Sequence, residues 1–125
     1  SHPVVLVGDV NVRPTMCEDY RGDPADGNVV AYQTLLKAGL TEVWPMVYPK
    51  SPCGSAGWTS GQDELDGPGS TLDHRIDDVF LSAGFSALQA DVVGDEQADR
   101  TPSGLWPSDH ASTWAMIRLD NANKR

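Results

Sequence analysis

The sequence has little of several features that would place it in a particular class. It has only two cysteines, Cys17 and Cys53, which excludes a scaffold built on several disulfides and a four-cysteine zinc site. No apolar run approaches the roughly 18 residues that a membrane-spanning helix needs. Basic residues are also scarce, because nine Lys and Arg stand against eighteen Asp and Glu and give a formal net charge of −9. That balance disfavours a broad, sequence-independent grip on nucleic acid, which requires clustered basic side chains.

The composition that remains is typical of one globular domain. Apolar residues make up 39% of the 125 residues and charged residues 22%, both ordinary values for a folded protein of single-domain size. Cys17 and Cys53 lie in separate turn-rich segments. The sequence leaves open whether they form one disulfide or remain two free thiols. A disulfide would favour a secreted or extracellular protein.

The pattern of apolar and turn residues predicts five strands and one helix. The continuous run Val4–Val7 predicts a strand buried on both faces. Apolar residues spaced by three and four predict a helix from Asn28 to about Ala38, which Gly39 ends. Further strands are expected at 40–44, 75–82, 87–93 and 113–119, with long irregular segments at 12–27, 45–70 and 94–108. These elements predict an α/β fold with one mixed or antiparallel sheet and a covering helix. Because one helix can cover only one face, we expect that the other face of the first strand is covered by something outside the chain.

A first pair of polar residues follows the first predicted strand. Asp9 and Asn11 would point to the same side of an extended segment. A carboxylate can accept a proton there, and a carboxamide can donate to a phosphoryl oxygen. The alternative is a plain turn in which these side chains bond the local backbone.

Two more polar groups lie at the ends of later strands. In the segment from Arg75 to Asp77, the two charged side chains would share one side of an apolar strand, so they must be solvated, paired or functional. Asp77 could orient an imidazole, as carboxylates do for catalytic histidines. Asp109 and His110 precede the last strand and offer an oxygen ligand for a divalent cation and a group that titrates near neutrality.

Two other enzyme classes fit these residues less well. An acyl hydrolase that used Ser108 and His110 would lack the Gly-x-Ser-x-Gly turn of many such enzymes. A zinc hydrolase that used His2, His74 and His110 would lack the paired His-x-x-x-His spacing.

Taken together, the three polar groups resemble the endonuclease/exonuclease/phosphatase superfamily, which has the deoxyribonuclease I-like fold. The resemblance rests on three motifs in the family's order: Val-Leu-Val-Gly-Asp9-Val-Asn11, Arg75-Ile-Asp77-Asp-Val-Phe-Leu-Ser and Ser108-Asp109-His110. It spans residues 3–119. It implies that residues 1–125 form the C-terminal half of a deoxyribonuclease I-like catalytic domain, which is half of a four-layer α/β sandwich. The N-terminal half of that domain, which carries a metal-binding Glu in the family, would then be missing.

The resemblance implies a metal-dependent phosphoesterase and gives each motif residue a role. Asp9 would align or deprotonate the attacking water, and Asn11 would bond a non-bridging phosphate oxygen. Asp109 would lie at the metal, with Mg²⁺ expected and Mn²⁺ or Ca²⁺ as alternatives. His110 would bond the scissile phosphate, and Asp77 would accept a hydrogen bond from His110 and fix its tautomer.

The resemblance also sets expectations for partners and substrates. The partner would be the missing N-terminal half or a second copy of the chain, and the substrate a nucleic acid, an inositol phosphate or a phospholipid. Asp78 stands where the family usually has an aromatic residue, and we expect it to add negative charge near the site. The alternative from another class is a non-catalytic half-domain that acts as a binding or interaction module.

Overall fold

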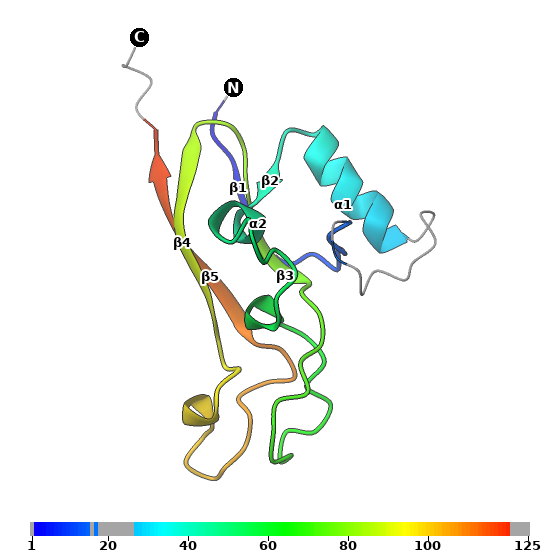
Figure 1. Ribbon diagram of the computed structural model, residues 1–125, viewed down its shortest axis with the longest axis vertical. Coiled ribbons are helices and arrows are strands. Elements are labelled where there is room, and N and C mark those ends of the chain that lie inside the picture. Colours follow the sequence, from blue (N-terminus) through cyan, green and yellow to red (C-terminus); the bar gives the residue numbers. More distant parts are fainter. Residues whose placement is uncertain (1, 16, 18–26, 121–125) are drawn as a thin grey trace.

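The computed structural model describes residues 2–15, 17 and 27–120 (Figure 1). The described residues form two antiparallel sheets, two α-helices and two short 3-10 helices. In chain order these are β1 (Val5–Asp9), α1 (Gly27–Lys37), β2 (Thr41–Glu42), α2 (Val43–Val47), η1 (Ser55–Gly57), β3 (Asp77–Leu81), β4 (Phe85–Val93), η2 (Gln97–Asp99) and β5 (Ser112–Leu119). The predicted α/β class is confirmed, whereas the prediction of a single sheet is wrong: β1, β3 and β2 form one sheet and the hairpin β4–β5 forms another.

β3 is the central strand of the larger sheet and is buried on both faces. Phe80 is fully buried against Val12 and Tyr32, on the side covered by α1. Val79 and Leu81 alternate with Phe80, so they point the opposite way. They lie in a second apolar cluster with residues of α2, β4 and β5.

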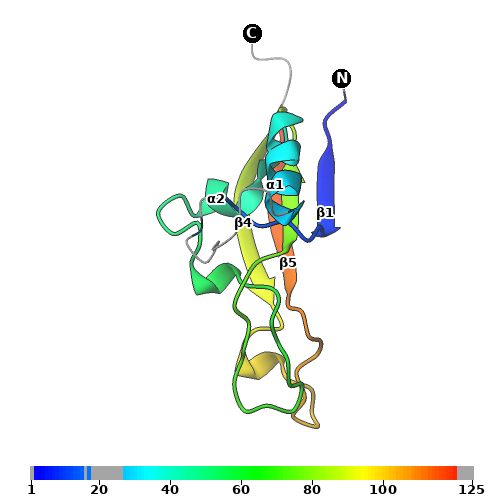
Figure 2. The same ribbon diagram turned by 90° about the vertical axis from the view of Figure 1, so that its right-hand side faces the viewer.

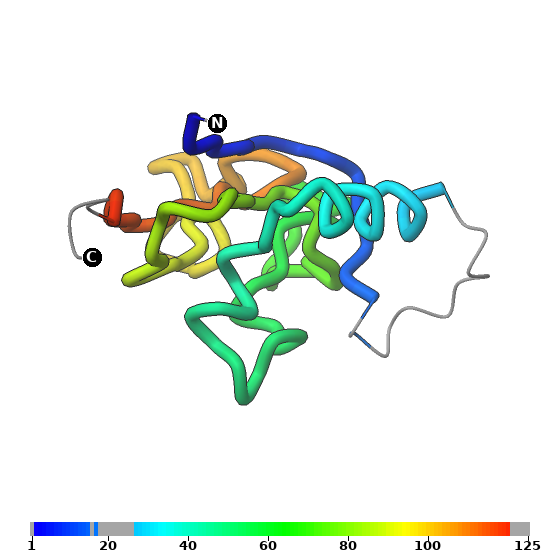
Figure 3. Tube along the Cα trace, turned by 90° about the horizontal axis from the view of Figure 1, so that it is seen from above, coloured from blue at the N-terminus to red at the C-terminus, as the bar shows by residue number. Residues whose placement is uncertain are grey.

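β1 is exposed along one face, as expected if the cover for that face of Val4–Val7 lies outside the chain. Val5 is 40% and Val7 60% exposed, while Leu6 packs toward α1. In Figures 2 and 3, α2 and the segment that follows it lie on one side of the strands, and β1 lies toward the other side. A continuous apolar run shows that a strand suits burial on both faces. It does not show that the same chain supplies both covers.

The segment expected to be a strand at 40–44 is divided between β2 and α2. β2 has two residues, and α2 begins directly after it at Val43. Pro45 falls in the first turn of α2, where its missing N–H costs no helical hydrogen bond. Among the described residues, no helix is long and apolar enough to cross a membrane.

Of the two states that the sequence left open for the cysteines, the structure has the disulfide. Cys17 and Cys53 are bonded across a sequence separation of 36 residues. The bond fastens the segment after β1 to the long segment between α2 and β3. Closing a loop of this length stabilises a fold by about 4 kcal/mol in the chain-entropy model.

A buried group of charged side chains lies beneath β3. Arg75 Nε donates to Glu42 Oε1 over 2.6 Å, and Tyr32 Oη donates to Glu42 Oε2 over 2.8 Å. Asp78 Oδ1 lies 3.3 Å from Arg75 Nε. Burial, followed by the neighbouring Glu42 carboxylate, raises the pKa of Asp78 to about 9. The raised pKa favours the protonated, neutral form of Asp78 at pH 7. The side chain also points away from Asp77, which corrects the expectation that it adds negative charge near the site.

Candidate functional site

The register of β1 and β3 brings two of the predicted site residues together. Asp9 is the last residue of β1 and Asp77 is the first residue of β3. The two are direct partners in the antiparallel pairing, so their side chains share one face of the sheet. Two carboxylates far apart in the sequence therefore meet at one end of the sheet.

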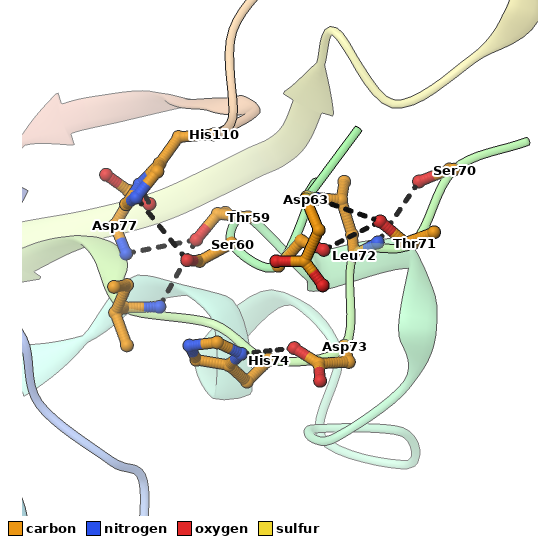
Figure 4. A network of polar contacts seen from close by, with 12 residues as sticks. Thr59, Ser60, Asp63, Ser70, Thr71, Leu72, Asp73, His74, Asp77 and His110 are labelled. Carbon is orange, nitrogen blue, oxygen red and sulfur yellow. Dashed lines mark hydrogen bonds and ion pairs between the residues drawn. The ribbon is translucent and has the colours of Figure 1, made fainter. Parts of the chain in front are cut away.

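The segment Thr59–Ser60 connects the start of β3 with the start of β5. Ser60 forms one isolated antiparallel bridge with His74 and another with His110. The Ala111 N–H donates to the Thr59 carbonyl over 2.8 Å. Figure 4 shows Ser60 between the rings of His110 and His74. This backbone ladder brings His110, which precedes β5, beside Asp77, which begins β3.

Thr59 fixes the backbone on which Asp77 sits. Its side chain is fully buried, and Oγ1 accepts hydrogen bonds from the N–H groups of Ile76 and Asp77 over 3.2 and 3.1 Å. The hydroxyl gives these two N–H groups a hydrogen-bond acceptor at the point where the sheet has no neighbouring strand to supply one. These two hydrogen bonds hold the backbone of Ile76 and Asp77 at the start of β3.

His110 contacts a different residue with each ring nitrogen. Nδ1 lies 2.8 Å from Asp77 Oδ2, and Nε2 lies 3.4 Å from Ser60 Oγ. The hydrogen bond with Asp77 is the largest cause of a raised His110 pKa; partial burial opposes it, and the carboxylates of Asp109 and Asp9 add to it. The contact expected between Asp77 and His110 is thus present, and it favours the tautomer that has its proton on Nδ1 when the ring is neutral.

Asp9, Asp77 and His110 form a group that could hold a metal ion. Each offers one ligand atom, and these atoms all lie within 4.8 Å of one another. Asp77 and His110 are already bonded to each other, whereas Asp9 is exposed. Mg²⁺ prefers carboxylate oxygens and keeps several waters, so this donor set fits it in part. The remaining ligands would come from water, from substrate or from residues outside the chain.

Two predicted site residues, Asn11 and Asp109, lie beside this group rather than in it. Asn11 has a positive φ of 49°, and its backbone N–H donates to Asp9 Oδ1 over 3.1 Å. The local turn that the sequence left as an alternative is therefore present, and the expected extended geometry is wrong. Asp109 is exposed and accepts a hydrogen bond from Ser108 Oγ over 3.1 Å. The metal-binding role of Asp109 and the phosphate-binding role of Asn11 stay predictions.

Ser60 is the site residue that the sequence did not single out. Ser60 lies in a long irregular segment with no periodic pattern. Its contact with His110 depends on the backbone bridges that Ser60 makes to two distant segments. A short polar side chain directly after Thr59 is the only local signal.

Comparisons with known proteins bear on the fold. No protein-family model matches the sequence, and no curated protein matches it. An endonuclease/exonuclease/phosphatase from Beutenbergia cavernae is similar in structure, with a TM-score of 0.60 and 22% identity over 97% of this chain. An endonuclease/exonuclease/phosphatase family protein from Leptotrichia buccalis has a TM-score of 0.56 and 22% identity over 95% of this chain.

The chain spans only part of those two proteins. It covers 28% of the Beutenbergia cavernae chain and 38% of the Leptotrichia buccalis chain. The described residues therefore have the fold of a part of endonuclease/exonuclease/phosphatase proteins, which confirms the resemblance inferred from the sequence at the level of the fold.

Proposed function

We propose that this chain carries one part of the active site of a metal-dependent phosphoesterase. The observation that carries the proposal is that Asp9, Asp77 and His110 lie close together, with one potential ligand atom of each within 4.8 Å of the others. Hydrolysis of a phosphoester needs a proton acceptor, a donor to the phosphoryl oxygens and a cation around one phosphorus atom. The similarity in fold to two endonuclease/exonuclease/phosphatase proteins supports the same class of reaction.

The His110–Asp77 pair would bind and stabilise the phosphate. Asp77 accepts a hydrogen bond from Nδ1, which orients the ring and raises the pKa of His110. The protonated ring can then donate from Nε2 to a phosphoryl oxygen on which negative charge grows during the reaction. Ser60 Oγ lies 3.4 Å from Nε2. It would contact this nitrogen when no phosphate is bound.

The carboxylate of Asp9 would receive the proton of the attacking water. Asp9 is exposed at the end of β1, and the N–H of Asn11 keeps one of its oxygens in place. The Asn11 side chain would donate to a non-bridging oxygen. A divalent cation, Mg²⁺ by preference over Mn²⁺ or Ca²⁺, would lie near Asp9 and Asp109 and supply Lewis-acid polarisation of the phosphoryl oxygen when bound.

The remaining part of the active site would come from outside the chain. Val5 and Val7 alternate on β1, and Trp114 and Met116 alternate on β5, and all four are exposed. Apolar side chains gathered on strand faces mark interaction surfaces. The occupant we propose is the N-terminal half of the same domain, which would also supply a metal-binding Glu, with a second copy of the chain as the alternative.

The test compares hydrolysis by this chain alone with hydrolysis by a longer protein that contains it. Bis(p-nitrophenyl) phosphate reports diester cleavage and p-nitrophenyl phosphate reports monoester cleavage. The longer protein should hydrolyse one of them with Mg²⁺, lose the activity with a chelator and regain it when Mg²⁺ is added back. The chain alone should be far less active. A longer protein that is folded but inactive with every divalent cation would favour the alternative, a non-catalytic binding module.

Two finer assignments extend this proposal. The substrate would be a nucleic acid, an inositol phosphate or a phospholipid, and the net charge of −9 disfavours duplex DNA. The disulfide between Cys17 and Cys53 supports a secreted or extracellular location, because such bonds persist in oxidising compartments.

A further inference from the structure

The contacts of the His110 ring also match the arrangement of a serine hydrolase. Ser60 Oγ lies 3.4 Å from Nε2, and Asp77 Oδ2 lies 2.8 Å from Nδ1 of the same ring. Figure 4 shows Ser60 and Asp77 beside the ring of His110. A hydroxyl, an imidazole and a carboxylate in this order form the catalytic group of serine hydrolases, which recurs on unrelated folds and is recognised by geometry rather than by sequence position.

The hydrogen-bond partners show where the protons lie when the ring is neutral. A carboxylate only accepts hydrogen bonds, so the contact with Asp77 places the proton of the ring on Nδ1. Nε2 is then an acceptor, and the hydroxyl of Ser60 is the donor to it. Ser60 is buried, and within the described ranges its Oγ forms no other hydrogen bond. The hydroxyl proton of Ser60 therefore faces a base.

Hydrogen bonds to the backbone hold both ends of this contact. The N–H of Ser60 donates to the His74 carbonyl over 3.0 Å, and the Ser60 carbonyl accepts from the N–H of Asp73 over 3.0 Å. The N–H of His110 donates to Ser108 Oγ over 3.1 Å. A reactive pair that is held in place loses little freedom when it reacts. The side chain of His110 is 29% exposed, so small molecules can reach the ring.

The residue after Ser60 supplies an unused backbone donor. Gly61 has a positive φ of 113°, and a Cβ at this position would lie 2.5 Å from Asp73 Oδ1, so only glycine fits. The N–H of Gly61 has no hydrogen-bond acceptor among the residues that the structure describes. In one large class of hydrolases, the N–H directly after the nucleophile stabilises the negative oxygen of the tetrahedral intermediate. The Gly61 N–H is available for that role.

We propose that Ser60 is a nucleophile and that this chain cleaves activated carboxylic esters without a metal ion. Ser60 Oγ forms a bond to the carbonyl carbon, and its proton moves to His110 Nε2, where the Asp77 carboxylate stabilises the charged ring. The bond between that carbon and the leaving oxygen then breaks, and the proton passes to the leaving oxygen. Water next attacks the acyl-serine and gives a proton to Nε2. The acid leaves, and that proton returns to Ser60 Oγ.

This activity is separate from the proposed phosphoesterase. It uses neither Asp9 nor a cation, and its nucleophile is a side chain instead of water. Ser60, Asp77 and His110 all belong to this chain, so the activity does not require the N-terminal half of the domain. The two activities share His110 and Asp77 but differ in every other component, so either proposal can fail alone.

The test is covalent labelling with a small alkyl fluorophosphonate in the presence of a chelator, followed by peptide mass spectrometry. Ser60 Oγ replaces fluoride on phosphorus, and its proton passes through His110 to water. We expect an adduct on Ser60, both in this chain and in a longer protein that contains it. His110→Ala should slow the labelling by about 10²-fold or more, and Ser60→Ala should abolish it. Release of p-nitrophenol from p-nitrophenyl acetate should fall in the same two variants.

Two further variants make the result unambiguous. Ser103→Ala is the matched control, because it removes the same hydroxyl from an exposed position, and its labelling rate should not change. Ser60→Cys covers the case in which Ser60→Ala fails to fold. Its thiol should react with iodoacetamide, and adding His110→Ala should slow that reaction.

Three results would overturn the proposal: an unlabelled Ser60 in both folded proteins, an adduct on Ser108 in its place, or equal labelling rates with and without the His110 side chain. Hydrolysis of bis(p-nitrophenyl) phosphate with Mg²⁺ is measured on the same samples. Loss of one activity and retention of the other then shows which of the two proposals has failed.

Discussion

At the scale of single residues, the candidate site depends on the contacts of one imidazole. His110 contacts Asp77 through Nδ1 and Ser60 through Nε2. The first contact follows from the sequence, because the family resemblance pairs the Asp of the second motif with the His of the third. The second could not be predicted, because Ser60 reaches His110 through backbone bridges that no local pattern encodes.

The Asp77→Asn change should lower the pKa of His110. The hydrogen bond to the Asp77 carboxylate is the largest cause of the raised pKa, and a neutral amide would remove most of that effect. A group with a raised folded-state pKa contributes stability below its unfolded pKa and loses it as the pH rises through the folded pKa. The stability lost in Asp77→Asn should thus be greatest below about pH 6 and should shrink at higher pH.

NMR titration of the His110 ring protons and unfolding by denaturant at several pH values measure these two effects. His2→Ala is the control for any general effect of charge, because His2 is exposed and is not one of the site residues. An unchanged His110 pKa in Asp77→Asn would show that the contact does not persist in solution.

Asp78→Asn should be tolerated at neutral pH and should stabilise the protein at higher pH. The pKa of Asp78 is raised to about 9, so the folded state holds a proton that the unfolded state has already released above about pH 4. Stability due to this group therefore falls as the pH rises from about 4 to about 9. Asn, which cannot ionise, removes that decline.

Unfolding free energies at pH 5, 7 and 9 test the prediction for Asp78. The exposed Asp66→Asn serves as the control and should leave the pH dependence unchanged. A steeper loss of stability at high pH in Asp78→Asn than in the unchanged protein would be incompatible with a neutral Asp78.

At the scale of elements, the sequence predicted those with a clear periodic pattern. The helix expected at 28–38 is α1, Gly27–Lys37, and the strand expected at 113–119 is β5, Ser112–Leu119. α2 was missed because five residues that include Pro45 carry too little pattern to identify a helix. The partition into two sheets could not be read from the strands either, since it depends on which distant strands pair.

The disulfide is the element-scale feature with the clearest effect on stability. Replacing Cys17 and Cys53 together by Ser should cost about 2–5 kcal/mol, because the unfolded chain regains the freedom of a long loop. Thermal unfolding with and without a reductant measures the loss. The unchanged protein should become less stable in the reductant, whereas the double variant should not respond. Equal stability of the oxidised protein and the double variant would show that the disulfide does not stabilise the folded state.

At the scale of the whole molecule, the fold of the described residues corresponds to only a part of two larger proteins. The chain covers 28% and 38% of the two similar proteins, and apolar side chains lie exposed on β1 and β5. The sequence predicted this from a resemblance that lacked the first half of the family's domain. It also predicted that the first strand would need cover from outside the chain, and Val5 and Val7 of β1 are exposed.

Met116→Lys should weaken association with the N-terminal half of the domain, which we propose as the partner. Met116 is 52% exposed on β5, between Ala115 and Ile117, which pack toward α2. It therefore points to the opposite side. Met46→Lys makes the same change on α2, where Met46 is 41% exposed, and should leave association unchanged. Affinity for a separately produced N-terminal half measures both, and equal effects of the two changes would place the interface elsewhere.

The most direct measurement of the proposed phosphoesterase site is turnover by a longer protein that contains this chain, with Mg²⁺, in two matched variants. His110→Ala removes the group proposed to bind the phosphate, and His2→Ala removes an exposed histidine outside the site. The proposed site predicts that His110→Ala lowers kcat by roughly 10²–10⁴-fold with the fold retained, while His2→Ala leaves kcat unchanged. Equal kcat values for His110→Ala and the unchanged protein would contradict it.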